Sequence, residues 1–142
     1  MGALLDASAL LALLDPDHPR HDDMAQWFDG HSKRGWATCA ITENGYLRII
    51  TAPRYANPVS IDVAADSLLQ TRTAPDHEFW PCDLSLFDRP TYDTDRILGP
   101  SQIPDIYLLG LAVAHGGTFV TLDRRISPNS VVGATDRHLS II

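Results

Sequence analysis

The stretch ALLDASALLALLDP, at residues 3–16, decides how this chain begins to fold. Its opening apolar run, at residues 3–5, is typical of a buried strand. A helical run follows from residue 7 to about residue 14, where Asp15-Pro16 stops it because the residue before a proline avoids helical backbone. The sequence therefore predicts a strand joined directly to a helix, with the carboxylate of Asp6 at the junction.

The same alternation of strands and helices continues along the chain. Apolar residues at helical spacing predict four more helices, at residues 19–32, 41–50, 61–71 (capped by Ser60) and 105–115. Strands are predicted at residues 35–39, 79–82 and 118–122, with one or two short strands in the tail at 130–142. Because strands alternating with helices form parallel sheets covered on both faces, we predict an α/β fold: a three-layer α/β/α domain with a central, mainly parallel sheet.

Length and composition indicate one ordinary globular domain, spanning residues 1–142. The chain is 44% hydrophobic and 20% charged, and a chain of this length usually forms a single core. No apolar run approaches the roughly 20 residues that span a bilayer, and the first residues lack a signal peptide's positive flank, so we expect a cytoplasmic protein without membrane contact. Cys39 and Cys82 lack a CxxC spacing, and we expect both to be buried free thiols rather than zinc ligands or a disulfide framework.

The formal net charge of −7 argues against indiscriminate binding to nucleic acid, because a broadly basic surface supplies most of that affinity. The objection weakens if several of the acidic residues hold metal, since bound cations attract phosphate.

Four acidic residues stand at unusual positions in the predicted elements. Asp6 and Asp123 directly follow strands, whereas Glu43 and Asp105 begin the core-facing stripes of helices. In a parallel sheet, the carboxyl ends of strands and the amino ends of helices share one rim, which is where such folds bind ligands. Converging carboxylates repel one another unless a cation lies between them, and oxygen ligands without histidine or cysteine favour Mg²⁺ or Mn²⁺.

Each acid taken alone has a simpler interpretation. Asp6 and Asp123 can be caps, and Glu43 and Asp105 can be first-turn residues that compensate a helix dipole. The coincidence of all four at one predicted rim is what favours a metal site.

The residues that carry this pattern resemble those of the PIN domains, and within them the VapC-type toxins of bacterial toxin–antitoxin pairs, with an actinobacterial branch as the best likeness. The resemblance covers nearly the whole chain. It rests on LLDASAL at residues 4–10, WATC at 36–39 leading to TENGYLR at 42–48, DIYLL at 105–109 and VTLDR at 120–124. One departure is Pro104, where relatives more often have Thr or Ser; it leaves Asp105 at the helix start.

By that resemblance, Asp6, Glu43, Asp105 and Asp123 are the acidic quartet that binds Mg²⁺ or Mn²⁺, with Ser8 and Thr121 as supporting polar residues. The resemblance also implies a metal-dependent endoribonuclease that cuts structured RNA, a tRNA or an rRNA, at restricted sites. The partners it implies are a cognate VapB-type antitoxin and a second copy of the chain, in a homodimer. Positioning contacts to RNA phosphates are expected from Arg48, Arg54, Arg124 and Arg125.

Two other classes of protein remain as alternatives. A phosphoaspartate phosphatase or receiver domain also places a carboxylate at a strand end, but it requires a late lysine, and Lys33 is the only lysine here. A non-enzymatic interaction module with the same fold would use apolar helices to bind a partner. Cleavage of DNA is not excluded by the acids themselves.

Overall fold

The computed structural model describes residues 2–142 and contains a five-stranded, wholly parallel sheet. The strands are β1 (Ala3–Leu5), β2 (Trp36–Cys39), β3 (His77–Trp80), β4 (Thr118–Thr121) and β5 (Leu139–Ile141). They lie in the order β3-β2-β1-β4-β5, so β1 is central and is flanked by β2 and β4. The carboxyl ends of these three strands consequently meet at one rim of the sheet.

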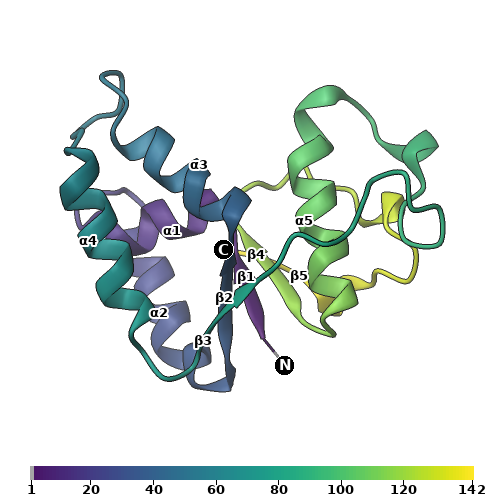
Figure 1. Ribbon diagram of the computed structural model, residues 1–142, viewed down its shortest axis with the longest axis horizontal. Helices are drawn as coiled ribbons and strands as arrows, with labels where there is room; N and C mark the ends of the chain where they lie inside the picture. The colour runs from purple at the N-terminus through teal and green to yellow at the C-terminus, as the bar shows by residue number, and fades with distance from the viewer. Residues whose placement is uncertain (1) are drawn as a thin grey trace.

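Helices cover both faces of the sheet. They are α1 (Ala7–Leu14), α2 (His21–His31), α3 (Ala40–Ile50), α4 (Ile61–Arg72) and α5 (Ile103–Ala114). Helices α1 to α4 lie on one side, and α5 lies on the other together with the long segment that precedes it (Figure 1). The predicted three-layer α/β/α fold is therefore confirmed. Among residues 2–142, no helix has the length and apolar character needed to cross a membrane.

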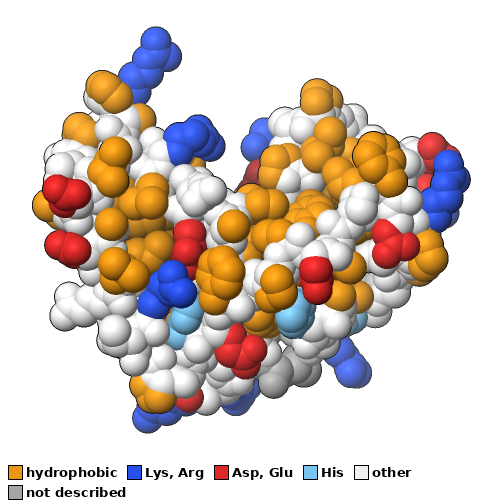
Figure 2. Space-filling view, viewed as in Figure 1, with side chains coloured by type: hydrophobic (Ala, Val, Ile, Leu, Met, Phe, Trp, Pro, Cys, Tyr) orange, Lys and Arg blue, Asp and Glu red, His pale blue; other side chains and the backbone are white. Residues whose placement is uncertain are grey.

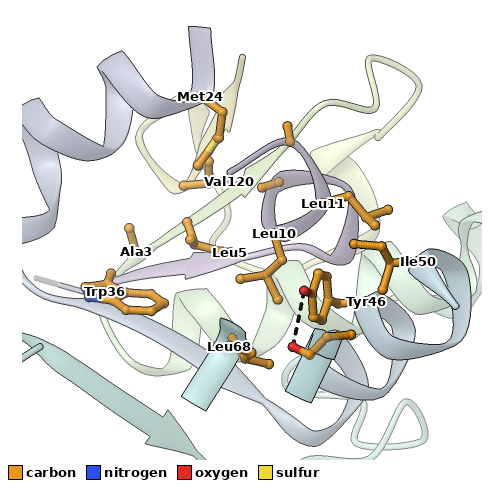
Figure 3. Close-up of a cluster of buried hydrophobic side chains, with 13 residues drawn as sticks. Ala3, Leu5, Leu10, Leu11, Met24, Trp36, Tyr46, Ile50, Leu68 and Val120 are labelled. Atoms are coloured by element: carbon orange, nitrogen blue, oxygen red, sulfur yellow. Dashed lines mark hydrogen bonds between the residues drawn. The ribbon is translucent and has the colours of Figure 1, made fainter. Parts of the chain in front are cut away.

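Two hydrophobic clusters sandwich the sheet because successive strand residues point to opposite faces. Leu5 joins the cluster beneath α1 to α4, whereas its neighbour Leu4 joins the cluster beneath α5. In the first cluster, Leu10 and Tyr46 are fully buried, and the Tyr46 hydroxyl donates to the carbonyl of Ala64 at 3.3 Å (Figure 3). Each face of the sheet thus has its own core.

The long segment between β3 and α5 is anchored by Tyr92. Its ring is buried, and its hydroxyl donates to the carbonyl of Tyr107 on α5. The ring approaches α5 closely at Gly110, where a Cβ atom would clash with the Tyr92 hydroxyl and ring. Glycine at this position is what lets the segment pack onto the helix.

Several element boundaries differ from those predicted. The edge strand β3 begins at His77, two residues before the predicted start, and α5 begins at Ile103, because Pro104 is tolerated in the first turn of a helix. The expectation that both cysteines are buried was wrong for Cys82, which is exposed just beyond the edge strand; Cys39 is buried.

Candidate active site

Asp6 is the most buried residue of the predicted quartet. It follows β1 and caps α1, where its Oδ1 accepts from the backbone N–H of Ala7 at 2.7 Å. Its Oδ2 accepts from the hydroxyls of Thr121 at 2.8 Å and Ser8 at 3.2 Å. Only 9% of the residue is exposed. The carboxylate is therefore held in one orientation by three neutral donors.

The neutral donors of Asp6 also connect β1 to the end of β4. The Thr121 hydroxyl accepts from the backbone N–H of Asp123 at 3.1 Å, and the Ser8 hydroxyl accepts from that of Leu122 at 3.2 Å. Thr121 is fully buried. Ser8 and Thr121 thus each donate to Asp6 and accept a backbone N–H just after β4.

Asp123 forms an ion pair with the side chain of Arg125. Its Oδ1 and Oδ2 accept from Nε and Nη2 of Arg125, each at 3.1 Å, and this pairing lowers the pKa of Asp123. Arg125 is thus bound to one of the predicted acids, whereas Arg124 is exposed beside it.

Three aspartates are close enough to influence one another's protonation. Burial raises the pKa of Asp105 to about 7, with further contributions from the negative charges of Asp6 and Asp123. Burial also raises the pKa of Asp6, and the charge of Asp123 adds to that shift. Ionising such a group costs free energy unless a cation compensates it. The structure therefore brings Asp6, Asp105 and Asp123 into one electrostatic unit.

Glu43 has a different set of partners. Its Oε2 accepts from the Thr38 hydroxyl at 2.6 Å and lies 3.1 Å from Nη1 of Arg72, which is the last residue of α4. The Thr38 hydroxyl also contacts Nε2 of His77 at 2.8 Å. The fourth predicted acid is therefore paired with a cation of the chain, and the sequence interpretation missed Thr38, Arg72 and His77.

A cleft of about 490 Å³ opens onto Asp6 and Asp105. It is lined by the start of α1, by one side of α3 and by the start of α5, including Asp6, Asn44, Arg48 and Asp105. In the space-filling view the surface is hollowed between the lobe that carries α3 and the lobe that carries α5 (Figure 2). Arg48 therefore stands on the wall of the cleft, whereas Arg54 is exposed in the loop after α3.

The donor set suits a hard divalent cation. The three aspartates offer only carboxylate oxygens, as Mg²⁺ and Mn²⁺ prefer, and a cation would relieve the cost of ionising Asp105. Within residues 2–142, no three acidic, histidine or cysteine side chains form a ready-made cage. The arrangement fits a cation held by the aspartates, with water or phosphate oxygens of a substrate as its remaining ligands.

Comparison with known proteins agrees with this geometry. The family model described as PIN domain matches residues 3–129. "Ribonuclease VapC44" of Mycobacterium tuberculosis is 48% identical over 142 residues, which is 100% of both chains. "Ribonuclease VapC39" of the same organism is 35% identical over 138 residues, covering 96% of this chain and 99% of the relative.

A solved structure shares the fold. It is described as VapBC2 from Rickettsia felis bound to a DNA fragment from their promoter, and it aligns with a TM-score of 0.54 over 88% of this chain and 90% of that one, at 12% identity. Sequence and fold lead to the same assignment: the chain belongs to the PIN domain family and, within it, to the VapC group.

Proposed function

We propose that this chain is the toxin of a toxin–antitoxin pair and acts as an endoribonuclease, hydrolysing phosphodiester bonds with Mg²⁺ or Mn²⁺ held at Asp6, Asp105 and Asp123. The observation that carries the proposal is the group of three electrostatically coupled aspartates, of which the two that line the cleft, Asp6 and Asp105, have raised pKa values. A cavity that makes carboxylates costly to ionise is one that attracts a cation.

Each residue of the site has a separable task in this reaction. A bound divalent cation supplies the activation of water and the stabilisation of the leaving 3′ oxygen. Thr121 and Ser8 orient the Asp6 carboxylate, and Arg125 keeps Asp123 ionised. Arg48, on the cleft wall, is placed to hold a substrate phosphate. Products with a 5′ phosphate and a 3′ hydroxyl are expected.

The finer parts of the proposal concern substrate and partners. A structured RNA, a tRNA or an rRNA, is the proposed substrate, with Arg54 and Arg124 as further phosphate contacts outside the cleft. A cognate VapB-type antitoxin is proposed to silence the site, and the toxin is proposed to work as a cytoplasmic homodimer. Glu43 is proposed as the fourth acid of the site, although in this structure it is paired with Arg72.

The proposal is tested by mapping cleavage products. Wild-type protein and Asp105→Asn would be incubated with total bacterial RNA and with single-stranded DNA, each with Mg²⁺, Mn²⁺ or a chelator. We expect discrete, metal-dependent cuts in RNA that Asp105→Asn loses. Asp66→Asn, at an exposed position on α4, is the matched control and should cut as the wild type does.

Other outcomes would change the assignment. A folded wild-type protein that binds no metal and cuts nothing would favour the non-enzymatic interaction module. Metal-dependent cuts in DNA as well as RNA would retain the site and reject the proposed substrate class.

A further inference from the structure

The carboxylate of Glu43 is bound by a cation that belongs to the chain itself. Nη1 of Arg72 lies 3.1 Å from Oε2 and 3.3 Å from Oε1, so the guanidinium contacts both oxygens. The side chain of Glu43 is 15% exposed and that of Arg72 is 31% exposed. The ion pair is therefore partly shielded from water, yet accessible enough for another cation to replace Arg72 as the partner of Glu43.

Further side chains hold both Arg72 and Glu43 in position. The Arg72 guanidinium lies over the ring of Phe79, 5.3 Å from its centroid, on the edge strand β3. Thr38 donates its single hydroxyl proton to Glu43, so His77 must donate from Nε2 to the Thr38 oxygen. The end of α4 and strands β2 and β3 thus converge to set the position of one carboxylate.

Asp6, Asp105 and Asp123 share none of these contacts with Arg72. Burial and the repulsion of neighbouring aspartates make Asp6 and Asp105 costly to ionise, and a fourth free carboxylate would increase the repulsion. Pairing Glu43 with Arg72 removes that charge from the site while no other cation is present. A divalent cation bound at the aspartates would offer Glu43 an alternative partner.

We propose that Arg72 is a positioning residue that competes with the metal cation for Glu43, so that recruitment of Glu43 to the aspartates requires release of the Arg72 ion pair. This inference rests on the proposed function, because it takes the aspartates as the cation site. It assigns to Arg72 a control over metal affinity. It also explains why three of the predicted acids are grouped while the fourth is held apart.

The test is a double-mutant cycle on metal affinity, measured without RNA. Mn²⁺ would be titrated into wild type, Arg72→Gln, Glu43→Gln and the double variant, and the free ion followed by electron paramagnetic resonance. We expect Arg72→Gln to lower the Kd for Mn²⁺ roughly two- to fivefold, the range expected for a partly exposed ion pair. Glu43→Gln should raise the Kd, and adding Arg72→Gln to it should change nothing further. Arg72→Lys, which keeps the charge, should bind as the wild type does.

The cycle separates this competition from general electrostatics. Removing any positive charge can favour cation binding, so Arg20→Gln, which breaks the exposed pair with Asp23 (2.9 Å), is the matched control and should leave the Kd unchanged. An equal gain from Arg72→Gln in both backgrounds would overturn the proposal. So would a Glu43→Gln variant with wild-type affinity.

Failure of this inference can be told from failure of the proposed function. If Mn²⁺ binds and Asp105→Asn abolishes binding, but the cycle shows no coupling, only the competition is overturned. If no variant binds Mn²⁺, both are overturned. Thermal unfolding of each variant verifies that it is folded before the titration.

Discussion

Asp6 and Glu43 stand near the ends of neighbouring strands, yet the protein holds their carboxylates in opposite ways. Asp6 is 9% exposed and accepts only from neutral groups, namely the Ala7 N–H and two hydroxyls. Glu43 accepts from one hydroxyl and from the guanidinium of Arg72. Burial accordingly raises the pKa of Asp6, and none of its three hydrogen-bond donors is positively charged.

The difference shows that a position at the rim does not by itself determine what a carboxylate does. Neutral donors orient the Asp6 carboxylate without cancelling its charge, so the charge remains available to a bound cation. A guanidinium partner both orients and neutralises. By this comparison, the aspartates keep their charge available to a metal cation, whereas the charge of Glu43 is already neutralised by Arg72.

The largest expected effect is on cleavage. Asp6→Asn keeps the shape of the side chain but removes the uncompensated charge, and it should lower the single-turnover rate of RNA cleavage roughly a hundredfold or more. Glu43→Gln removes a charge that Arg72 already neutralises, so we expect a smaller loss, on the order of tenfold. Equal losses in the two variants would show that the comparison fails, and circular dichroism would establish that both are folded.

The strand-end and helix-start positions of the acids could be predicted from sequence because the signals are local. The apolar run before Asp6, the apolar run before Asp123 and the proline before Asp105 are all within a few residues of the acid they place. The parallel sheet then brings these positions to one rim. The sequence predicted four acids at that rim, and the structure groups the three aspartates there while Glu43 is paired with Arg72.

The partners of Glu43 could not be predicted in the same way. Arg72 is 29 residues away along the chain, and the contact between Thr38 and His77 spans 39 residues. That contact depends on the pairing of β2 with the edge strand β3, whose start was misplaced by two residues. Side-chain contacts across such a register carry no local signal. For the same reason, no local pattern predicted the packing of Tyr92 against Gly110.

The second prediction concerns stability. Removing the carboxylate charge should raise the free energy of unfolding at Asp105 and lower it at Glu43. At pH 8 without metal, Asp105→Asn should raise the free energy of unfolding by about 1 kcal/mol, because it removes a partly buried charge that is repelled by its neighbours. Glu43→Gln should lower it by about 1–2 kcal/mol, because it weakens a charged hydrogen bond to Arg72. Urea denaturation measures both.

The pH dependence sharpens that contrast. The pKa of Asp105 is raised from its usual 3.8 to about 7, so the folded protein holds the proton more tightly than the unfolded chain does. The resulting stabilisation is complete below about pH 4 and is lost as the pH rises through 7. The gain from Asp105→Asn should therefore be larger at pH 8 than at pH 5. A gain that is constant with pH would contradict the assignment of the effect to this carboxyl.

Effects of similar or smaller size are expected from the two buried threonines that hold these carboxylates. Thr121→Val removes a donor to Asp6 and an acceptor for the Asp123 N–H, and Asp6 has no guanidinium partner to compensate. Thr38→Val removes a donor to Glu43, but Arg72 remains bound to it. We therefore expect losses of about 1–2 kcal/mol for Thr121→Val and about 0.5–1 kcal/mol for Thr38→Val in urea denaturation.

The order of these two losses tests the comparison itself, since the substitutions are chemically identical and both sites are fully buried. Each substitution also removes one acceptor, for the Asp123 N–H at Thr121 and for His77 Nε2 at Thr38, so we attribute the difference to what remains around the carboxylate: neutral hydrogen bonds at Asp6, an ion pair at Glu43. A combined Thr38→Val, Arg72→Gln variant should then lose more than the sum of its parts, because Glu43 would be left without either partner. If Thr38→Val is instead the costlier single change, the threonine rather than the arginine is the main support of Glu43.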